Sequence, residues 1–291
     1  MHNQIPAFFI DGSASDLGYV STRDCSWNID SKAFVENLWR RFYPYADSQF
    51  PEDARNHFLQ RFWEMYLAVT LLDKGFEITK HGDAGPEFSV QIDGKRVWFE
   101  AVSPTHGTGP DKVPELVLGE EARTVPVKEI LLRFTNALAE KKGRYVAAVA
   151  KGIIAPGDPY ILAINSRGIP DASIGNTMPY IVQAFFPIGP LTVAIDSKTR
   201  EVTDSFHHYR PQITKVSGAE VSTRSFLDHD AAFCSAVIHS GVDYLNYPAN
   251  LGADFSVLHN LKAAHPITEA TFPWCIQWAV RDDQLCRSLG V

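Results

Sequence analysis

The chain has 291 residues, of which 45% are hydrophobic and 21% charged, and its formal net charge is −7. This composition is that of a folded globular protein with a sizeable core, and it excludes a disordered or low-complexity chain. The acidic balance argues against a surface that attracts nucleic acid everywhere, but it leaves a local basic groove open.

The sequence carries no signal for secretion or membrane insertion. The N-terminal stretch MHNQIPAFFIDGS lacks a basic n-region, and no segment approaches the ~18 apolar residues that span a bilayer. The four cysteines are scattered without CxxC spacing, so neither a disulfide framework nor a zinc knuckle is supported. We expect a cytoplasmic protein that does not contact membranes.

Apolar periodicity and turn signals predict the elements in chain order. Helices are predicted over 31–42, 52–74 and 127–150. A Gly/Pro/Thr-rich loop is predicted over 104–114. Strands are predicted over 76–80, in a hairpin within 81–102, and over 159–165, 191–196, 200–206, 233–240 and 254–260.

Helices that alternate with strands indicate an α/β fold, with a mixed central sheet flanked by helices. We divide the chain into an N-terminal helical extension (1–51), an α/β core (52–166) and a C-terminal extension with further strands and helices that packs on the core (167–291). Because no repeat or low-complexity linker separates these parts, we expect one continuous domain.

The hairpin register follows from Asp93-Gly94, a two-residue turn pair between alternating apolar runs. This turn places Ile92 opposite Lys95, and each outward step pairs residues whose numbers sum to 187. Glu87 is then expected opposite Glu100. Phe88, Val90, Ile92, Val97, Phe99 and Ala101 are predicted to share the core-facing side of the hairpin.

Opposed like charges are destabilising, so the two glutamates need compensation. A shared proton, a nearby Arg or Lys, or a divalent cation could supply it. The alternative is a solvated strand end in which one carboxylate bends towards water.

A third acidic residue, Glu64, lies on the helix predicted over 52–74. Helical spacing turns it partly towards the apolar side, with Leu67, Ala68 and Leu71, where a carboxylate needs a partner. The alternative is a boundary glutamate paired with Arg61.

An inward helix glutamate, then GPEF opening one strand and WFEAV closing the next, resembles the PD-(D/E)XK nuclease superfamily, also called restriction-endonuclease-like. The resemblance covers roughly residues 52–165. It implies a nuclease-like core in which Glu87, Glu100 and Glu64 hold Mg²⁺, with Mn²⁺ as a substitute. Glu87 stands where Asp is commoner, and Val102 occupies the position of the family's catalytic Lys.

A lysine from another element could replace the missing one. In the helix over 127–150, Lys141 lies on the same stripe as Phe134, Ala137, Leu138, Tyr145 and Ala148, so it should face the sheet. Lys142 is nearly as well placed, and Arg133 lies two turns earlier. The alternative for Lys141 is a lysine that snorkels at a helix boundary.

Residues 123–151 carry seven basic residues against two acidic ones. With the resemblance, this stretch predicts contacts of Arg133, Lys142 and Arg144 to a phosphate backbone. His81 and His106 are candidate acids or bases near the hairpin ends, and Asp83 is more typical of a turn than of a metal ligand.

The leading interpretation is a Mg²⁺-dependent nuclease with Glu87, Glu100 and Lys141 as catalytic residues, acting on DNA in preference to RNA. Superfamily members often act as dimers, which leaves a homodimer open. A catalytically degenerate module that binds nucleic acid or protein is the first alternative. A retaining glycosidase with two carboxylates is the second.

Overall fold

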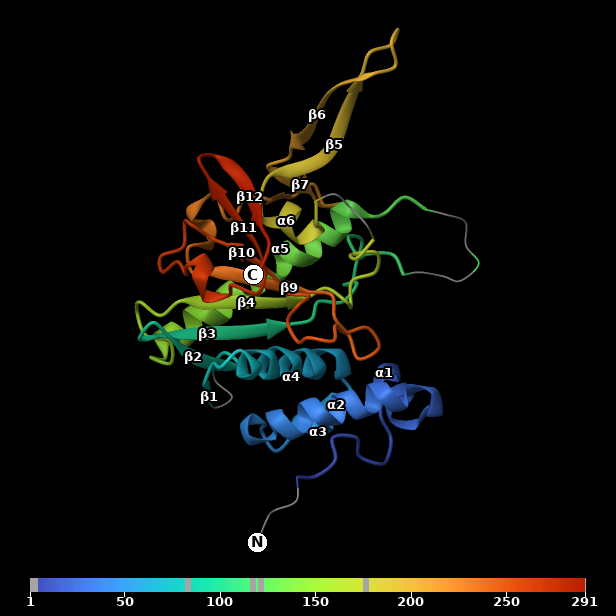
Figure 1. Ribbon diagram of the computed structural model, residues 1–291, viewed down its shortest axis with the longest axis vertical. Helices are drawn as coiled ribbons and strands as arrows, with labels where there is room; N and C mark the ends of the chain where they lie inside the picture. Colours follow the sequence, from blue (N-terminus) through green and yellow to red (C-terminus); the bar gives the residue numbers. More distant parts are fainter. Residues whose placement is uncertain (1–4, 82–84, 116–118, 120–122, 175–177, 291) are drawn as a thin grey trace.

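The computed structural model describes residues 5–81, 85–115, 119, 123–174 and 178–290. A helical layer formed by the N-terminal part lies against one side of a large sheet, and a β-hairpin projects from the other end of the molecule (Figure 1). The helices are α1 (Leu17–Asp24), α2 (Ile29–Phe42), α3 (Phe50–Ala54), α4 (Phe58–Asp73), α5 (Val127–Ala150) and α6 (Tyr180–Phe185).

Eight strands form the main sheet, in the order β1-β2-β3-β4-β9-β10-β11-β12. Neighbouring strands are parallel at β3/β4, β4/β9 and β10/β11 and antiparallel elsewhere. The strands are β1 (Ile78–Lys80), β2 (Phe88–Ile92), β3 (Lys95–Val102), β4 (Tyr160–Asn165), β9 (Ala236–Ser240), β10 (Ser256–His259), β11 (Ile276–Arg281) and β12 (Gln284–Ser288). The predicted α/β class with a mixed sheet is confirmed.

The β2/β3 hairpin has the predicted turn and register. Asp93 and Gly94 have φ of 49° and 75°, as a two-residue hairpin turn requires, and Ile92 pairs with Lys95. The ladder ends at Phe88 and Phe99, so Glu87 lies one residue before β2 begins.

Side chains cover the sheet on both faces. The predicted core face of the hairpin packs in one cluster with Trp39, Phe62 and Leu67 of the N-terminal helices. The opposite face of the main sheet packs in a second cluster with Leu131 and Ile181, which lie on α5 and α6. Since β4 contributes to both clusters, it is buried along its whole length, as a central strand should be.

The helix predicted over 52–74 is two helices, so the prediction of one continuous helix was wrong. The chain leaves helical conformation between α3 and α4, and the Asp16 carboxylate accepts a hydrogen bond from the Phe58 N–H at 2.9 Å where α4 begins. The same carboxylate caps α1 through the N–H groups of Gly18 and Tyr19. A residue 42 positions away therefore helps to set the start of α4.

Two small sheets lie apart from the main one. β5 (Ile188–Ile195) and β6 (Val202–Tyr209) form the projecting hairpin, and β7 (Gln212–Thr214) pairs with β8 (Glu220–Ser222). All four cysteines are free, as expected. Within the described residues, no helix has both the length and the apolar character to cross a bilayer.

Candidate active site

The candidate site lies where β2 stops and β3 continues. Beyond the last β2 pair, the edge of β3 is taken by the side chain of Gln60 from α4. Its Nε2 donates to the Ala101 carbonyl at 3.2 Å, and its Oε1 accepts from the Ser103 N–H at 2.7 Å. This contact holds α4 against the end of β3 and brings the acid of α4 towards those of the hairpin.

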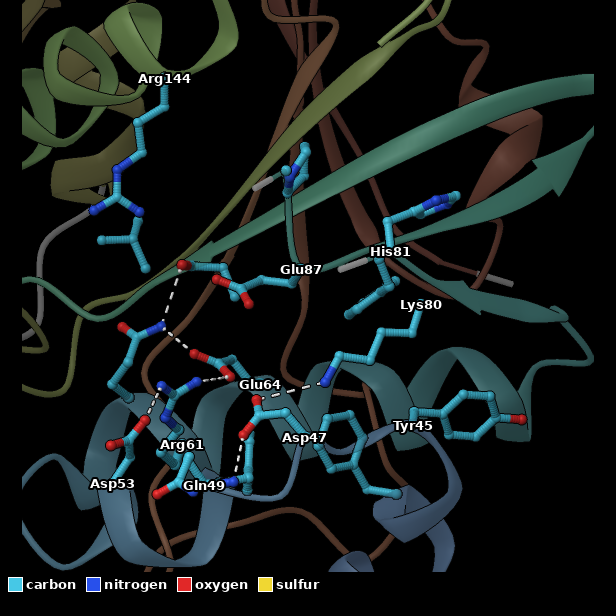
Figure 2. A pocket seen from close by; sticks show the side chains of 18 of the residues that line it. Tyr45, Asp47, Gln49, Asp53, Arg61, Glu64, Lys80, His81, Glu87 and Arg144 are labelled. Atoms are coloured by element: carbon cyan, nitrogen blue, oxygen red, sulfur yellow. Dashed lines mark hydrogen bonds and ion pairs between the residues drawn. The ribbon is translucent and has the colours of Figure 1, made fainter. Parts of the chain in front are cut away.

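A cavity of about 980 Å³ opens at this junction (Figure 2). Its inner wall includes Glu64, Glu87 and Lys141, and its outer wall comes from the segment around Tyr45, which precedes α3. The other charged or titratable side chains in its lining are Asp47, Asp53, Arg61, Lys80, His81, Glu140 and Arg144.

Glu64 is buried, with 4% of its surface exposed. Its carboxylate accepts hydrogen bonds from Arg61 at 2.7 Å and Gln60 at 2.8 Å. Burial raises the pKa of Glu64, and the charge of Arg61 opposes this shift. The partner expected in the alternative interpretation, Arg61, is therefore present, and it also bonds Asp53 at 2.8 Å.

Glu87 is half-buried and differs from the other two acids. Within the part of the chain that the structure describes, its carboxylate has no hydrogen bond or ion pair. Burial, followed by the negative charges of Glu64 and Glu100, raises its pKa well above the usual value, and the charges of Lys141 and Arg61 counteract this only in part. Glu87 is thus an uncompensated carboxylate directed into an acidic environment.

Glu100 is 3% exposed and is paired with Lys141, which the stripe on α5 predicted to face the sheet. The ammonium group of Lys141 donates to Glu100 Oε1, and both side chains are buried. Arg144 approaches the same oxygen at 3.5 Å while most of its side chain stays exposed. A lysine from α5 therefore lies beside the strand glutamate, and Val102 follows two residues later on the same strand.

The other two predicted phosphate contacts lie elsewhere. Lys142 donates to the Asp230 carbonyl at 3.1 Å, because the next residue on a helix points about 100° away from Lys141. Arg133 donates to the Thr105 carbonyl at 2.9 Å. The structure brings only Arg144 of the three to the cavity.

His81 lines the cavity, whereas His106 lies near Glu115, with His106 Nε2 at 3.6 Å from its carboxylate. The His81 ring is in hydrogen-bond contact with Ser89 Oγ at 2.8 Å. Burial and then the charge of Arg96 lower its pKa, which favours the neutral ring. Asp83 lies outside the described residues.

Sequence reasoning missed Gln60 and the outer wall. The spacing of Gln60 and Glu64, four residues apart on one helix, was the available signal for the first. The outer wall is held by an ion pair between Asp47 and Lys80 at 3.5 Å and by the Arg61–Asp53 pair. Both pairs join residues that no local pattern connects.

Carboxylate oxygens are the ligands that Mg²⁺ prefers, so the donor chemistry of Glu64, Glu87 and Glu100 fits this ion. As they are placed, no three His, Cys, Asp or Glu side chains among the described residues form a ready-made metal-binding group. Comparisons with protein-family models, curated proteins and solved structures gave no match to this chain.

Proposed function

We propose that the chain is a Mg²⁺-dependent nuclease of the restriction-endonuclease-like type that hydrolyses phosphodiester bonds, in DNA rather than RNA. The observation that supports this most is the state of Glu87. A carboxylate that has no hydrogen bond or ion pair among the described residues, next to two further buried glutamates, is where a divalent cation would relieve repulsion.

Glu87, Glu100 and Glu64 would hold the ion. When bound, it supplies Lewis-acid activation of water and neutralises charge on the phosphate. Lys141 holds the Glu100 carboxylate in place through their ion pair, and it lines the cavity, where its ammonium group can stabilise developing negative charge. Arg144, exposed at the rim, is suited to bind a neighbouring phosphate.

The first test measures cleavage of plasmid, linear and single-stranded DNA, and of RNA, with Mg²⁺ or Mn²⁺. We expect cleavage that EDTA abolishes and that Glu87→Gln lowers at least 100-fold, because the amide removes the charge that attracts the ion. Glu77→Gln is the matched control, since Glu77 is an exposed glutamate outside the cavity lining. Equal cleavage by Glu87→Gln and wild type would disprove the catalytic assignment.

Glu100 needs a double variant, because removing it alone leaves Lys141 buried without a counter-charge. Glu100→Gln combined with Lys141→Met replaces the ion pair by neutral groups of similar volume. We expect a protein that folds, with a near-ultraviolet circular dichroism spectrum like that of the wild type, and that does not cleave. Retained cleavage by this folded variant would exclude both residues from catalysis.

A non-catalytic binding module is the second candidate, and a specific observation favours it. Glu64 and Glu100 are already compensated by Arg61 and Lys141, so two of the three acids do not require an ion. A Mn²⁺ titration separates the candidates. The degenerate module should bind Mn²⁺ no better than its Glu87→Gln variant, whereas the nuclease should bind it more tightly.

A further inference from the structure

The projecting hairpin is an unusual feature for a protein that acts alone. Among the described strands, β5 and β6 pair only with each other, and the hairpin extends away from the main sheet (Figure 1). A two-stranded ribbon is only marginally stable in water, and exposed apolar edge strands tend to pair with other chains. Its large exposed apolar side chains are Leu191, Val193, Ile195, Val202, Phe206 and Tyr209.

The charges of the hairpin indicate which kind of molecule can bind to it. Residues 188–209 contain two basic residues, Lys198 and Arg200, and three acidic ones, Asp196, Glu201 and Asp204. A surface that binds nucleic acid or anionic lipid needs an excess of positive charge, which this ribbon lacks. Its occupant is therefore another protein surface.

The two edges of the ribbon are not equivalent. Pro190 in β5 has no N–H to donate, which makes the outer edge of β5 a poor partner for a further strand. Along β6, the Ser205 N–H donates to the Asp204 carboxylate at 2.7 Å, as an N–H on the free edge of a strand can. Ser205 and, by alternation, His207 therefore present their backbone groups to the free edge of β6.

We propose that β6 is the pairing edge for a second copy of this chain. Two β6 strands would run antiparallel about a twofold axis at Phe206, giving a four-stranded sheet β5-β6-β6-β5. In this register Phe206 lies opposite Phe206 of the second copy, and Asp204 lies opposite its His208. The sequence is self-complementary there, with aromatic on aromatic at the centre and acid on histidine on both sides.

The backbone alternation restricts the register. Because hydrogen-bonded pairs must join residues that both face the new edge, slips of an odd number are excluded. Two permitted alternatives are equally near. One centres on Ser205 and places the Asp204 carboxylate opposite the Phe206 ring, and the other centres on His207 and places Phe206 opposite His208, so neither has paired aromatic rings at its centre with acid on histidine at both sides. In the proposed register, the Asp204 carboxylate gives up its hydrogen bond from the Ser205 N–H and contacts His208 of the second copy instead. This inference does not depend on the proposed nuclease activity.

Disulfide trapping tests the register on the full-length chain. The Phe206 pair is of the non-hydrogen-bonded kind, with Cα atoms about 4.5 Å apart, which a disulfide can bridge. We expect Phe206→Cys to form a covalent dimer within minutes of mild oxidation. Val193→Cys, equally exposed but on β5, should remain monomeric on a non-reducing gel, as should the wild type with its native cysteines.

Light scattering after size exclusion tests the dimer without new cysteines. We expect the mass of two chains for the wild type, at least a tenfold weaker dimer for Asp204→His, and recovery in Asp204→His with His208→Asp, which swaps the two partners. A monomer at all concentrations, together with no cross-link at Phe206, would overturn the proposal. A cross-link at Ser205→Cys but not at Phe206→Cys would overturn the register.

Discussion

At the scale of single residues, Glu87 is a carboxyl group in partly buried, acidic surroundings. Its folded-state pKa is raised, so between the unfolded and the folded pKa the native state holds more protons than the unfolded state. The free energy of unfolding of the metal-free protein therefore falls as pH rises through this window. Below the unfolded-state pKa, Glu87 is protonated in both states, so the repulsion between its carboxylate and those of Glu64 and Glu100 is absent.

Because the free energy of unfolding falls as pH rises, a prediction follows for Glu87→Gln in EDTA. The variant should be more stable than wild type at pH 8, by on the order of 1 kcal/mol, and equal to it near pH 4. Urea unfolding at a series of pH values measures the difference. A difference that does not change with pH would contradict the raised pKa, and Glu77→Gln should show no such dependence.

The placement of Lys141 shows what residue patterns can predict. The helical stripe on α5 predicted Lys141 correctly as an inward side chain, because periodicity fixes direction on a helix. The same reasoning ranked Lys142 too high, since neighbours on a helix cannot face one site. The contact of Gln60 with β3 could not be predicted from the helix alone, because its partner Ala101 lies 41 residues further along.

At the scale of elements, local chemistry explains which boundaries were predicted. The Asp93-Gly94 turn fixes its own register, so the hairpin followed from the sequence. The break between α3 and α4 did not, because the residues at 55–57 include neither Gly nor Pro. It coincides with a cap supplied by Asp16, which is a tertiary contact.

Asp16 therefore provides a prediction at this scale. Its carboxylate accepts from the N–H groups of Gly18 and Tyr19 in α1 and of Phe58 in α4. Asp16→Ala removes caps from two helices at once and should lower the free energy of unfolding by about 2 kcal/mol. The urea midpoint measures this loss. Asp11→Ala, at an exposed position in the same segment, should change it by less than about 0.5 kcal/mol.

At the scale of the whole molecule, the N-terminal helices belong to the main core. Phe8, Tyr19, Trp39 and Phe50 are almost fully buried in the same cluster as Phe58 of α4. These side chains are joined by aromatic contacts, such as the stacked rings of Trp39 and Phe50 at 5.8 Å. The sequence predicted a helical extension with one helix over 31–42, but neither α1 nor the shared packing, which depends on the folded arrangement.

A chain that begins at residue 52 should therefore fail to fold. Removing these aromatic side chains leaves one face of the sheet and α4 exposed to water, at a cost of about 2 kcal/mol for each large side chain. Near-ultraviolet circular dichroism and thermal unfolding measure the outcome. As a control, replacing residues 196–201 at the tip of the hairpin by Asn-Gly should leave the melting transition cooperative. A cooperative transition in the shortened chain would contradict the prediction.

Trp98 has a consequence for how the cavity can be observed. Its indole is fully buried, donates to Asp158 at 2.9 Å and lies against the His81 ring, with centroids 4.3 Å apart. His81 in turn lines the cavity. We expect the fluorescence of this indole to change when a charge enters next to the imidazole, so Trp98 is an intrinsic fluorescent probe of the cavity. Subtracting the emission of Trp98→Phe from that of the wild type separates the fluorescence of Trp98 from that of the other five tryptophans.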